Sequence, residues 1–232
     1  KSPELRSAAI VIKMTAMQAP IRAPPTLQVH PVTADNPLLQ DFDLPPYSVI
    51  RPEHVEPAVD AILADSRVAI AQLLAQQNAA PSWHGLVLAL DELGARLSRA
   101  WSPVSHLNAV CNSAELRAAY EACLPKLSEY WTELGQNRGL FEAYQALASG
   151  PAAAAFDVAQ KTILEHALRD FRLSGIDLPA AGQQRYGAIQ MKLSELTSNF
   201  SNQLLDATQA WSKHITDEAA LAGLTDSAKA QM

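Results

Sequence analysis

The stretch QQRYGAIQMKLSELTSNFSNQLLDATQAW, residues 183–211, carries the strongest structural pattern of this 232-residue sequence. Its apolar residues recur at steps of three or four, and polar residues fill the positions between them. This spacing puts the apolar side chains on one face of an α-helix. We therefore predict a single long helix from about Pro179 to Ile215. Its apolar stripe consists of Tyr186, Ile189, Leu193, Leu196, Phe200, Leu204, Ala207, Trp211 and Ile215.

The residues before this helix predict how it packs. Gly175 follows a segment of helical spacing that ends near Phe171, where a glycine commonly adopts the left-handed conformation that closes a helix. The chain would then reverse its direction. We expect the stripe from Tyr186 onward to pack against the helix that ends at Phe171. Phe200 and Trp211 are accordingly expected in the core.

Helical spacing also marks five earlier segments. Pro57 suits the first position of a helix, where a missing N–H costs nothing, and Ser82 suits an N-cap. Pro103 lies inside the second segment, so we expect a kink or a restart of the helix at Ser102–Pro103. The segments run from Pro57 to about Gln77, from Ser82 to Leu107, from a capping box at Asn112–Glu115 to Leu134, from Leu140 to Leu147, and from about Pro151 to Leu173.

Composition agrees with a helical chain. Ala and Leu are abundant and there are only nine Gly, a bias that favours helix. No stretch alternates polar and apolar residues in the way a half-buried strand does. The sequence therefore predicts an all-α fold of long antiparallel helices that pack through their apolar stripes.

Residues 1–35 differ from the rest of the sequence. Ten of the fifteen prolines lie before residue 60, and the first 35 residues are basic and poorly periodic. A cleaved targeting peptide is one interpretation of such a segment. We favour a disordered extension, because the segment offers no apolar face to bury. The predicted organisation is therefore an extension over 1–35 and a helical domain over 36–232.

Charge and cysteine content exclude several classes of protein. The net charge of −6 argues against nucleic-acid binding, which needs clustered Lys and Arg along the phosphates. No apolar run approaches the roughly 18 residues that a membrane span needs. The two cysteines, Cys111 and Cys123, form no CxxC pair. A single disulfide remains open, but we favour two thiols in a reducing cytoplasm.

Glu165 and His166 form the sequence's nearest approach to a zinc motif. A helical zinc protease site needs two histidines four residues apart, with a glutamate beside the first. No second histidine follows His166 one turn later, and the closest two of the six histidines are 22 residues apart. The pair also lies opposite the apolar face of its segment. We therefore predict a solvated polar face. The six are His30, His54, His84, His106, His166 and His214.

Two other histidines have polar neighbours. His54 lies among Glu53, Glu56 and Asp60, but carboxylates near a helix start are better explained by the positive end of the helix dipole. His106 follows Ser102 and Ser105, and we expect a local hydrogen bond there.

No catalytic, cofactor-binding or metal-ligating residue is predicted. The sequence contains no GxSxG elbow and no phosphate-binding glycine loop. Cys111 and Cys123 fall on or near apolar stripes, where Cys acts as a small hydrophobe.

The order of the segments carries a resemblance. The blocks NPLLQDFDLPPYSVIRPEHVEPAV (36–59) and ALRDFRLSGIDLP (167–179), together with the 183–211 stretch, resemble the opening third of the thimet oligopeptidase family of zinc metallopeptidases. The resemblance runs from about Asn36 to the end of the sequence. Residues 1 to about 35 have no counterpart in it.

The resemblance implies a two-lobed, almost entirely helical enzyme that hydrolyses internal bonds of short peptides in the cytoplasm. This chain would form part of the amino-terminal lobe and one wall of the substrate channel. The family's HExxH motif and its one zinc ion belong to the carboxy-terminal part, so no site residue transfers to this chain. Short peptides are the implied partners, without nucleic acid or membrane.

Two hypotheses follow from this resemblance. In the first, the sequence is the amino-terminal part of a zinc oligopeptidase and is inactive alone. In the second, it is a non-catalytic helical binding module derived from such an enzyme. The final DEAALAGLTDSAKAQM (217–232) is expected to be helical and has no capping Gly or Pro at its end, so we expect a truncated chain.

Overall fold

The structure is a computed structural model that describes residues 35–77 and 81–231. The predicted disorder of the amino-terminal extension falls on residues outside this description. Every secondary-structure element in the described residues is a helix, and these residues contain no strand. The all-α prediction is therefore confirmed. No helix among the described residues is long and apolar enough to cross a membrane.

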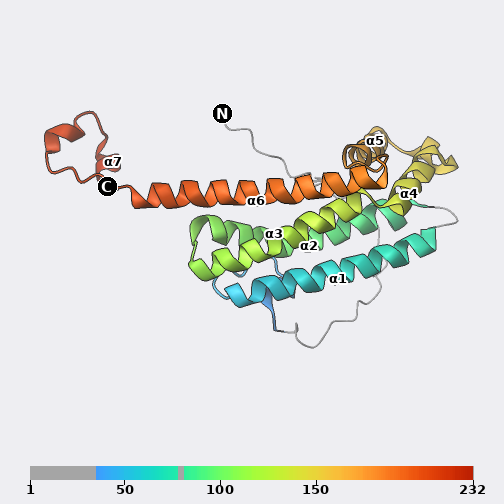
Figure 1. Ribbon diagram of the computed structural model, residues 1–232, viewed down its shortest axis with the longest axis horizontal. Helices are drawn as coiled ribbons and strands as arrows, with labels where there is room; N and C mark the ends of the chain where they lie inside the picture. The colour runs from blue at the N-terminus through green and yellow to red at the C-terminus, as the bar shows by residue number, and fades with distance from the viewer. Residues whose placement is uncertain (1–34, 78–80, 232) are drawn as a thin grey trace. The chain divides into compact units, whose positions relative to one another are not determined.

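The elements follow one another along the chain as shown in Figure 1. They are η1 (Pro37–Leu39), α1 (Pro52–Gln77), η2 (Trp83–Leu88), α2 (Ala89–Val110), α3 (Ala114–Gly135), α4 (Arg138–Ser149), η3 (Pro151–Ala155), α5 (Val158–Leu173), α6 (Ala180–Ala210), η4 (Glu218–Leu221) and α7 (Asp226–Lys229). The chain divides into two compact units, up to residue 194 and from residue 195, and α6 passes from the first into the second.

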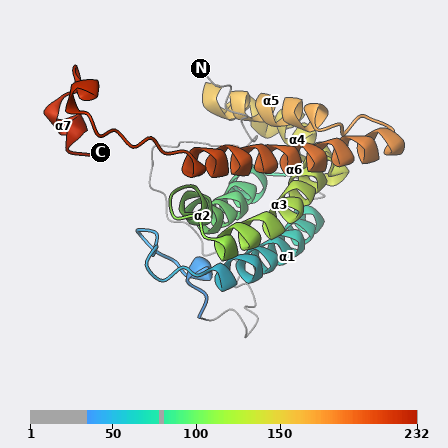
Figure 2. The ribbon, with the colours of Figure 1, turned by 60° about the vertical axis from the view of Figure 1, so that its left-hand side comes forward.

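The first unit is built on an antiparallel arrangement of α1, α2 and α3. Figures 1 and 2 show α2 running opposite to its two neighbours, with α1 lying beside both. The inward stripe of α1 supplies much of the core between them. It includes Val55, Val59, Ile62, Leu63, Ile70 and Leu73, all of which are buried. Leu86, Val104, Cys123 and Leu127 meet it from the other elements.

Helix α1 begins five residues earlier than predicted, so the assignment of Pro57 to the first position is wrong. Pro52 occupies that position, and Pro57 lies in the second turn. The side chain of His54 explains the earlier start, because its Nδ1 accepts a hydrogen bond of 3.0 Å from the Arg51 N–H. A donor at the helix end is thereby satisfied, as in half of a capping box.

Helix α2 follows a short π-helical turn, η2. Ser82 is the N-cap as predicted, and its Oγ accepts a hydrogen bond of 3.1 Å from the Gly85 N–H. The predicted restart at Pro103 is wrong, since α2 continues through it to Val110. Pro103 is fully buried against the core, and this burial offsets the hydrogen bond that proline removes.

The caps of α3 and α5 also differ from prediction. The N-cap of α3 is Ser113, not Asn112, because the Ser113 Oγ accepts from the Leu116 N–H. The fifth segment does not start at Pro151, since the separate turn η3 comes first. Asp157 then opens α5 with a reciprocal capping box to Gln160. At α3, two neighbouring small polar side chains compete for the cap, and spacing alone does not separate them.

Gly175 closes α5 as predicted, with φ of +86°. The Ile176 N–H donates to the Phe171 carbonyl at 3.1 Å, the long hydrogen bond of a Schellman motif. Two glutamines hold the following turn. Gln136 donates to the Ser174 carbonyl at 3.0 Å, and Gln183 donates to the Ile176 carbonyl at 3.2 Å. The turn is thus anchored to the end of α3.

Helix α6 departs from prediction in length and in packing. It ends at Ala210 and not at Ile215. None of its side chains is buried, so the expected packing of its stripe against α5 is wrong. Phe200 and Trp211, which were expected in the core, are 68% and 72% exposed. Beyond α6, the predicted terminal helix is broken into η4 and α7, and Gly223 between them has positive φ.

Candidate functional site

Glu165 and His166 lie exposed on α5, as predicted. Their polar neighbours on this helix are engaged in local contacts. Thr162 donates to the Val158 carbonyl at 2.9 Å, and Arg169 pairs with Asp170 at 2.9 Å. Asp170 is the residue one helical turn after His166, where a second zinc ligand would stand. Its carboxylate forms an ion pair with Arg169 instead. This polar face is a solvated helix surface.

The acidic cluster around His54 is dispersed by the fold. The His54 ring accepts from the Arg51 N–H, and its carbonyl accepts from the Asn36 side chain at 2.8 Å. Glu56 and Asp60 turn instead to Lys126 on α3, at 2.8 and 2.6 Å from its Nζ. These two carboxylates therefore link α1 to α3, a role beyond the helix-dipole interpretation given to them above.

The environment of Lys126 favours its charged form. Partial burial lowers the pKa of the amine, while the hydrogen bonds to Asp60 and Glu56 raise it, and the net shift is upward. The ion triplet is half-exposed, with 32% of the Lys126 side chain accessible. Its contribution to stability is therefore on the order of 1 kcal/mol or less.

His106 makes a different contact from the local hydrogen bond that we expected. Its ring lies 5.4 Å from the ring of Tyr47, centroid to centroid. The Oγ atom of Ser102 lies 3.4 Å from the Oγ atom of Ser98, and the Ser105 side chain is hydrogen-bonded to Tyr120. The serines and the histidine are therefore not brought together into a nucleophile and base.

Among the residues that the structure describes, no group of three or more His, Cys, Asp or Glu could hold a metal ion. His84 is exposed on η2, His214 is exposed in the loop that follows α6, and His30 lies outside the description. The described part of the chain therefore does not fit a zinc site.

The two cysteines lie in contrasting environments. Both are free thiols, Cys111 on the surface and Cys123 fully buried. Burial raises the pKa of the Cys123 thiol to about 12, although Lys126 acts in the opposite direction. A thiol in this environment stays protonated and is a poor nucleophile. Cys123 is a core residue, as its spacing predicted, whereas Cys111 is not buried.

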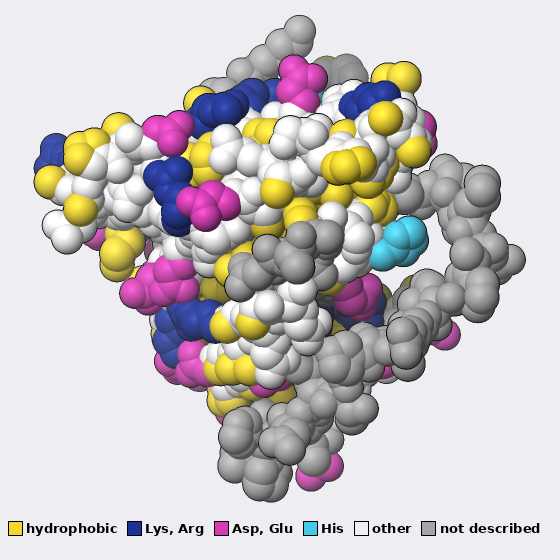
Figure 3. All heavy atoms as spheres, turned by 90° about the vertical axis from the view of Figure 1, so that its right-hand side faces the viewer, with side chains coloured by type: hydrophobic (Ala, Val, Ile, Leu, Met, Phe, Trp, Pro, Cys, Tyr) yellow, Lys and Arg dark blue, Asp and Glu magenta, His cyan; other side chains and the backbone are white. Residues whose placement is uncertain are grey.

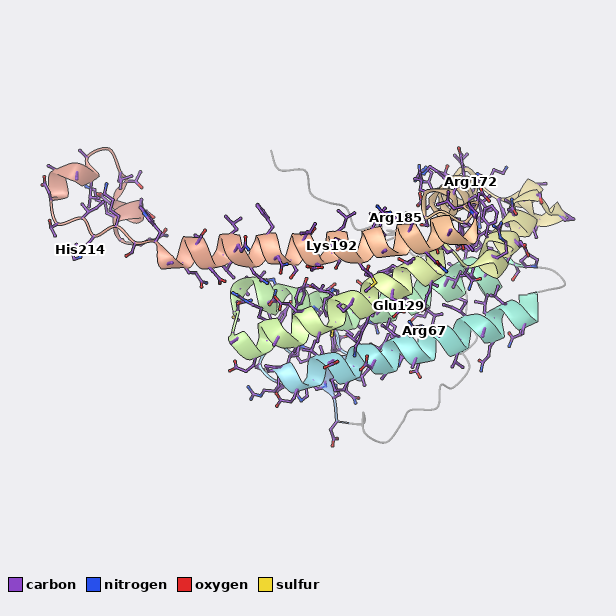
Figure 4. The ribbon with its side chains drawn as sticks, viewed as in Figure 1. Arg67, Glu129, Arg172, Arg185, Lys192 and His214 are labelled. Carbon is purple, nitrogen blue, oxygen red and sulfur yellow. The ribbon has the colours of Figure 1, made fainter. Side chains whose placement is uncertain are left out.

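Charge pairs between helices were not apparent from the sequence. Arg67 of α1 binds Glu133 of α3 through two hydrogen bonds, of 2.7 and 3.1 Å. Figure 4 shows Arg67 beside Glu129, which adds a second negative charge. The hydrogen bond to Glu133 is the main reason that the pKa of Arg67 is raised. Arg96 likewise binds Asp65 at 2.8 Å. Residues 30 or more positions apart form these pairs, so helical spacing could not reveal them.

Two hollows mark the surface of the first unit. An acidic one lies at the Arg99–Asp41 ion pair and includes Phe42, Asp43 and Glu92. An apolar one lies between η3 and α5, with Phe156, Leu164 and Leu168 in its wall and Lys161 and Glu165 at its edge. Figure 3 shows hydrophobic side chains interspersed with charged ones at this end of the first unit. Neither hollow combines a nucleophile with a base.

Comparison with known families places this chain beside a family of peptidases. The sequence profile described as "Neurolysin/Thimet oligopeptidase, N-terminal domain" matches residues 59–184. The match begins inside α1, covers α2 to α5 and ends in the first residues of α6.

Curated relatives extend this similarity. The chain is 53% identical to oligopeptidase A of Haemophilus influenzae over 197 residues, which are 85% of this chain and 29% of that protein. It is 53% identical over 195 residues to oligopeptidase A of Escherichia coli, covering 84% of this chain and 28% of that protein. Identity to a probable cytosolic oligopeptidase A of Arabidopsis thaliana is 34% over 195 residues, with the same two shares. The chain thus spans less than a third of the length of these relatives.

Proposed function

The chain belongs to the neurolysin/thimet oligopeptidase family, and we propose that it is the amino-terminal part of a zinc-dependent peptidase that hydrolyses internal bonds of short peptides. The observation that carries this proposal is the 53% identity to bacterial oligopeptidase A over 197 residues. Identity of this degree extends over most of the chain and not over one short motif.

The catalytic zinc, in this proposal, is bound by the part of a family polypeptide that lies outside this chain. The described residues contain no suitable ligand group, and the buried thiol of Cys123 stays protonated. Zinc sites in hydrolases use about three protein ligands. This chain would therefore contribute no ligand and no catalytic base.

The role that we propose for this chain is confinement. Helices α1, α2 and α3 would form a wall of the channel that admits short peptides. Two features suit a wall. The continuous core from Val55 to Leu73 makes α1 rigid, and ion pairs such as Lys126–Asp60 and Arg67–Glu133 tie it to α3. A rigid wall excludes folded proteins by size and needs no reactive group of its own.

The cytoplasm is the compartment that we propose for the protein. Two free thiols, Cys111 and Cys123, suit a reducing environment. The relative from Arabidopsis thaliana described above is named a probable cytosolic oligopeptidase A.

A chimera tests the proposed function. Residues 36–232 would replace the aligned part of a bacterial oligopeptidase A, and the product would be assayed with a short internally quenched peptide. We expect chelator-sensitive cleavage by the chimera. The control is the same chimera with the glutamate of the relative's own zinc motif changed to glutamine, which should be inactive.

A correctly folded, zinc-loaded chimera without activity would contradict the proposal. The second hypothesis, a non-catalytic binding module, would then gain support. Circular dichroism and metal analysis of the chimera separate this outcome from simple misfolding.

A further inference from the structure

Residues 36–51 form a strap that precedes α1 and lies against its first turn. Both ends of the strap are anchored in the core, since Leu38 is 3% and Ile50 is 7% exposed. The part between them lies on the surface, where Leu44 is 82% exposed. Figure 2 shows the strap in blue, as a loop beside the start of α1. The contacts at its two ends therefore decide whether the strap stays in place.

His54, in the first turn of α1, receives both ends of the strap. The Asn36 side chain donates to the His54 carbonyl at 2.8 Å, and the Arg51 N–H donates to the His54 Nδ1 at 3.0 Å. The His54 N–H in turn donates to the Arg51 carbonyl at 3.0 Å. The imidazole thus takes the place that a Glu or Gln side chain has in a capping box.

The hydrogen bond from Arg51 requires a neutral imidazole. A backbone N–H can only donate, so Nδ1 of His54 must accept through its lone pair, and the proton of the neutral ring lies on Nε2. Acid adds a proton to that lone pair. Two N–H groups would then face each other, and the ring would carry a positive charge at the positive end of the α1 dipole. Protonation of His54 therefore disfavours the attached strap for two reasons.

We propose that His54 is a pH-sensitive latch, which holds the strap at neutral pH and releases it in mild acid. Histidine is the side chain that ordinarily changes its charge between about pH 5 and 8. The attachment is complete while the ring is neutral and is lost as the pH falls through the titration of His54. Release would uncover Leu38 and Ile50, which belong to the core cluster. These contacts all lie within the first unit, so the inference does not depend on the proposed function.

The charged groups of the elements around the first turn of α1 are exposed or already paired. Glu53 is exposed, so water and salt weaken its attraction for a protonated His54 ring. Glu56 pairs with Lys126 of α3, and η1 carries no ionisable side chain. A protonated His54 would therefore gain no strong ion pair to replace the lost hydrogen bond. The other charged residues of these elements are exposed Asp35 and Arg51, Arg117 of α3, which is hydrogen-bonded to Asn112, exposed Glu121 of α3, and Arg99 of α2, which pairs with Asp41.

The other contacts of the strap respond differently to acid. Asp41 pairs with Arg99 at 2.9 Å, but the Asp41 side chain is 98% exposed, so this pair contributes little. The ring of Tyr47 lies 5.4 Å from the ring of His106. An aromatic face also attracts a cation, so protonation of His106 does not weaken that contact. His54 is therefore the contact of the strap that is most sensitive to mild acid.

Amide hydrogen exchange of the full chain, followed by NMR, tests the latch. We expect the protection factors of the Leu38, Arg51 and His54 amides to fall about threefold to tenfold between about pH 7.5 and 5.5, as for the loss of one helix cap. His54→Gln keeps an acceptor that does not titrate and should make these protection factors independent of pH. His54→Ala should lower them at both pH values. His106→Gln is the matched control, because His106 also lies beside the strap, and it should respond to acid like the unmodified chain.

The imidazole itself gives a second measurement. Nitrogen NMR shifts of His54 should show an unprotonated Nδ1 at neutral pH, and the loss of protection should follow the protonation of that atom. A ring with its proton on Nδ1 at neutral pH would overturn the inference, as would a strap that loosens at a pH where His54 does not titrate. Equal pH dependence in the unmodified chain and in His54→Gln would also overturn it, and so would a response that only His106→Gln removes.

Discussion

Gly135 at the end of α3 lies directly against Ser174 at the end of α5, so that a Cβ on Gly135 would stand 2.5 Å from the Cβ of Ser174. Two helix ends that are far apart in sequence therefore meet where neither has room for another methyl group. The Gln136 side chain donates to the Ser174 carbonyl beside this contact. This junction positions the turn that leads into α6.

Gly135→Ala should destabilise the protein. The added methyl group would force α3 away from Ser174, and we expect the free energy of unfolding to fall by about 1–3 kcal/mol. Gly94→Ala is the matched control. Gly94 is also helical, and nothing lies within 4 Å of the position that a Cβ would take there, so Ala should add up to about 1 kcal/mol of stability. Urea unfolding of both variants measures the difference, and a stabilised Gly135→Ala would contradict the close contact.

Gly175→Val should also destabilise the protein, by on the order of 1 kcal/mol or more, because a β-branched residue resists the φ of +86°. The side chain would in addition approach Leu178, whose Cδ1 lies 2.9 Å from the position of an added Cβ. Gly175→Asn is the comparison, since Asn tolerates the left-handed region better. Equal denaturant midpoints for the two variants would show that the positive φ of residue 175 is not the cause of the lost stability.

The buried side chains of α1 should contribute more to the stability of the protein than the ion pairs on its surface. Ile62 is 1% exposed, and Ile62→Ala should cost about 2–5 kcal/mol because it leaves a cavity. Lys126→Met keeps the length of the side chain but removes its half-exposed pairs with Glu56 and Asp60, and should cost about 1 kcal/mol or less. Thermal unfolding of both variants tests this order, and a larger loss for Lys126→Met would contradict it.

Alkaline pH should destabilise the protein through Cys123. Its pKa is about 12 when folded and 9.0 as the ordinary value, so the unfolded chain loses its proton first as the pH rises. The contribution of the protonated Cys123 thiol to the free energy of unfolding is complete below pH 9.0 and is lost as the pH rises through about 12. Its slope approaches about 1.4 kcal/mol per pH unit. Unfolding free energies between about pH 8 and 10 should fall less steeply for Cys123→Ala.

Thiol labelling gives an independent check of the same site. At neutral pH we expect one fast-reacting thiol in the folded chain, Cys111, and two after unfolding. Rapid labelling of both thiols in the folded protein would show that Cys123 is accessible.

The isolated chain should bind no stoichiometric zinc and cleave no peptide. The described residues contain no group of ligands for the ion. Metal analysis after dialysis against zinc, together with the quenched-peptide assay, measures both properties. Chelator-sensitive cleavage by the chain alone would contradict the proposal that the catalytic residues lie outside it.

Local pattern was sufficient for most of the helices and for some of their ends. The stripes of α1 and α4 were found from spacing, and Ser82 and Gly175 were found as caps because each satisfies backbone groups within a few residues. The errors at Pro57 and Asn112 have a common origin. Where more than one residue within about two turns can begin a helix, the choice depends on contacts such as the hydrogen bond from the Arg51 N–H to the His54 side chain.

The absence of a predicted site had a different basis. Spacing was enough to place Glu165 and His166 on a solvated face. It could not show that Glu56 and Asp60 bind Lys126, because those partners are more than 60 residues apart.

The sequence by itself determined that this protein is helical, since the period of its apolar residues is a local property of each segment. Only the tertiary structure decided which face of α6 meets the bundle. The apolar stripe predicted burial, yet Gly187 lies against Thr132 and Phe200 remains exposed. The packing of two helices depends on the complementary shape of their surfaces as well as on hydrophobicity, and small residues allow the closest approach. The side chains of a second helix determine that fit, so no pattern within α6 could reveal it.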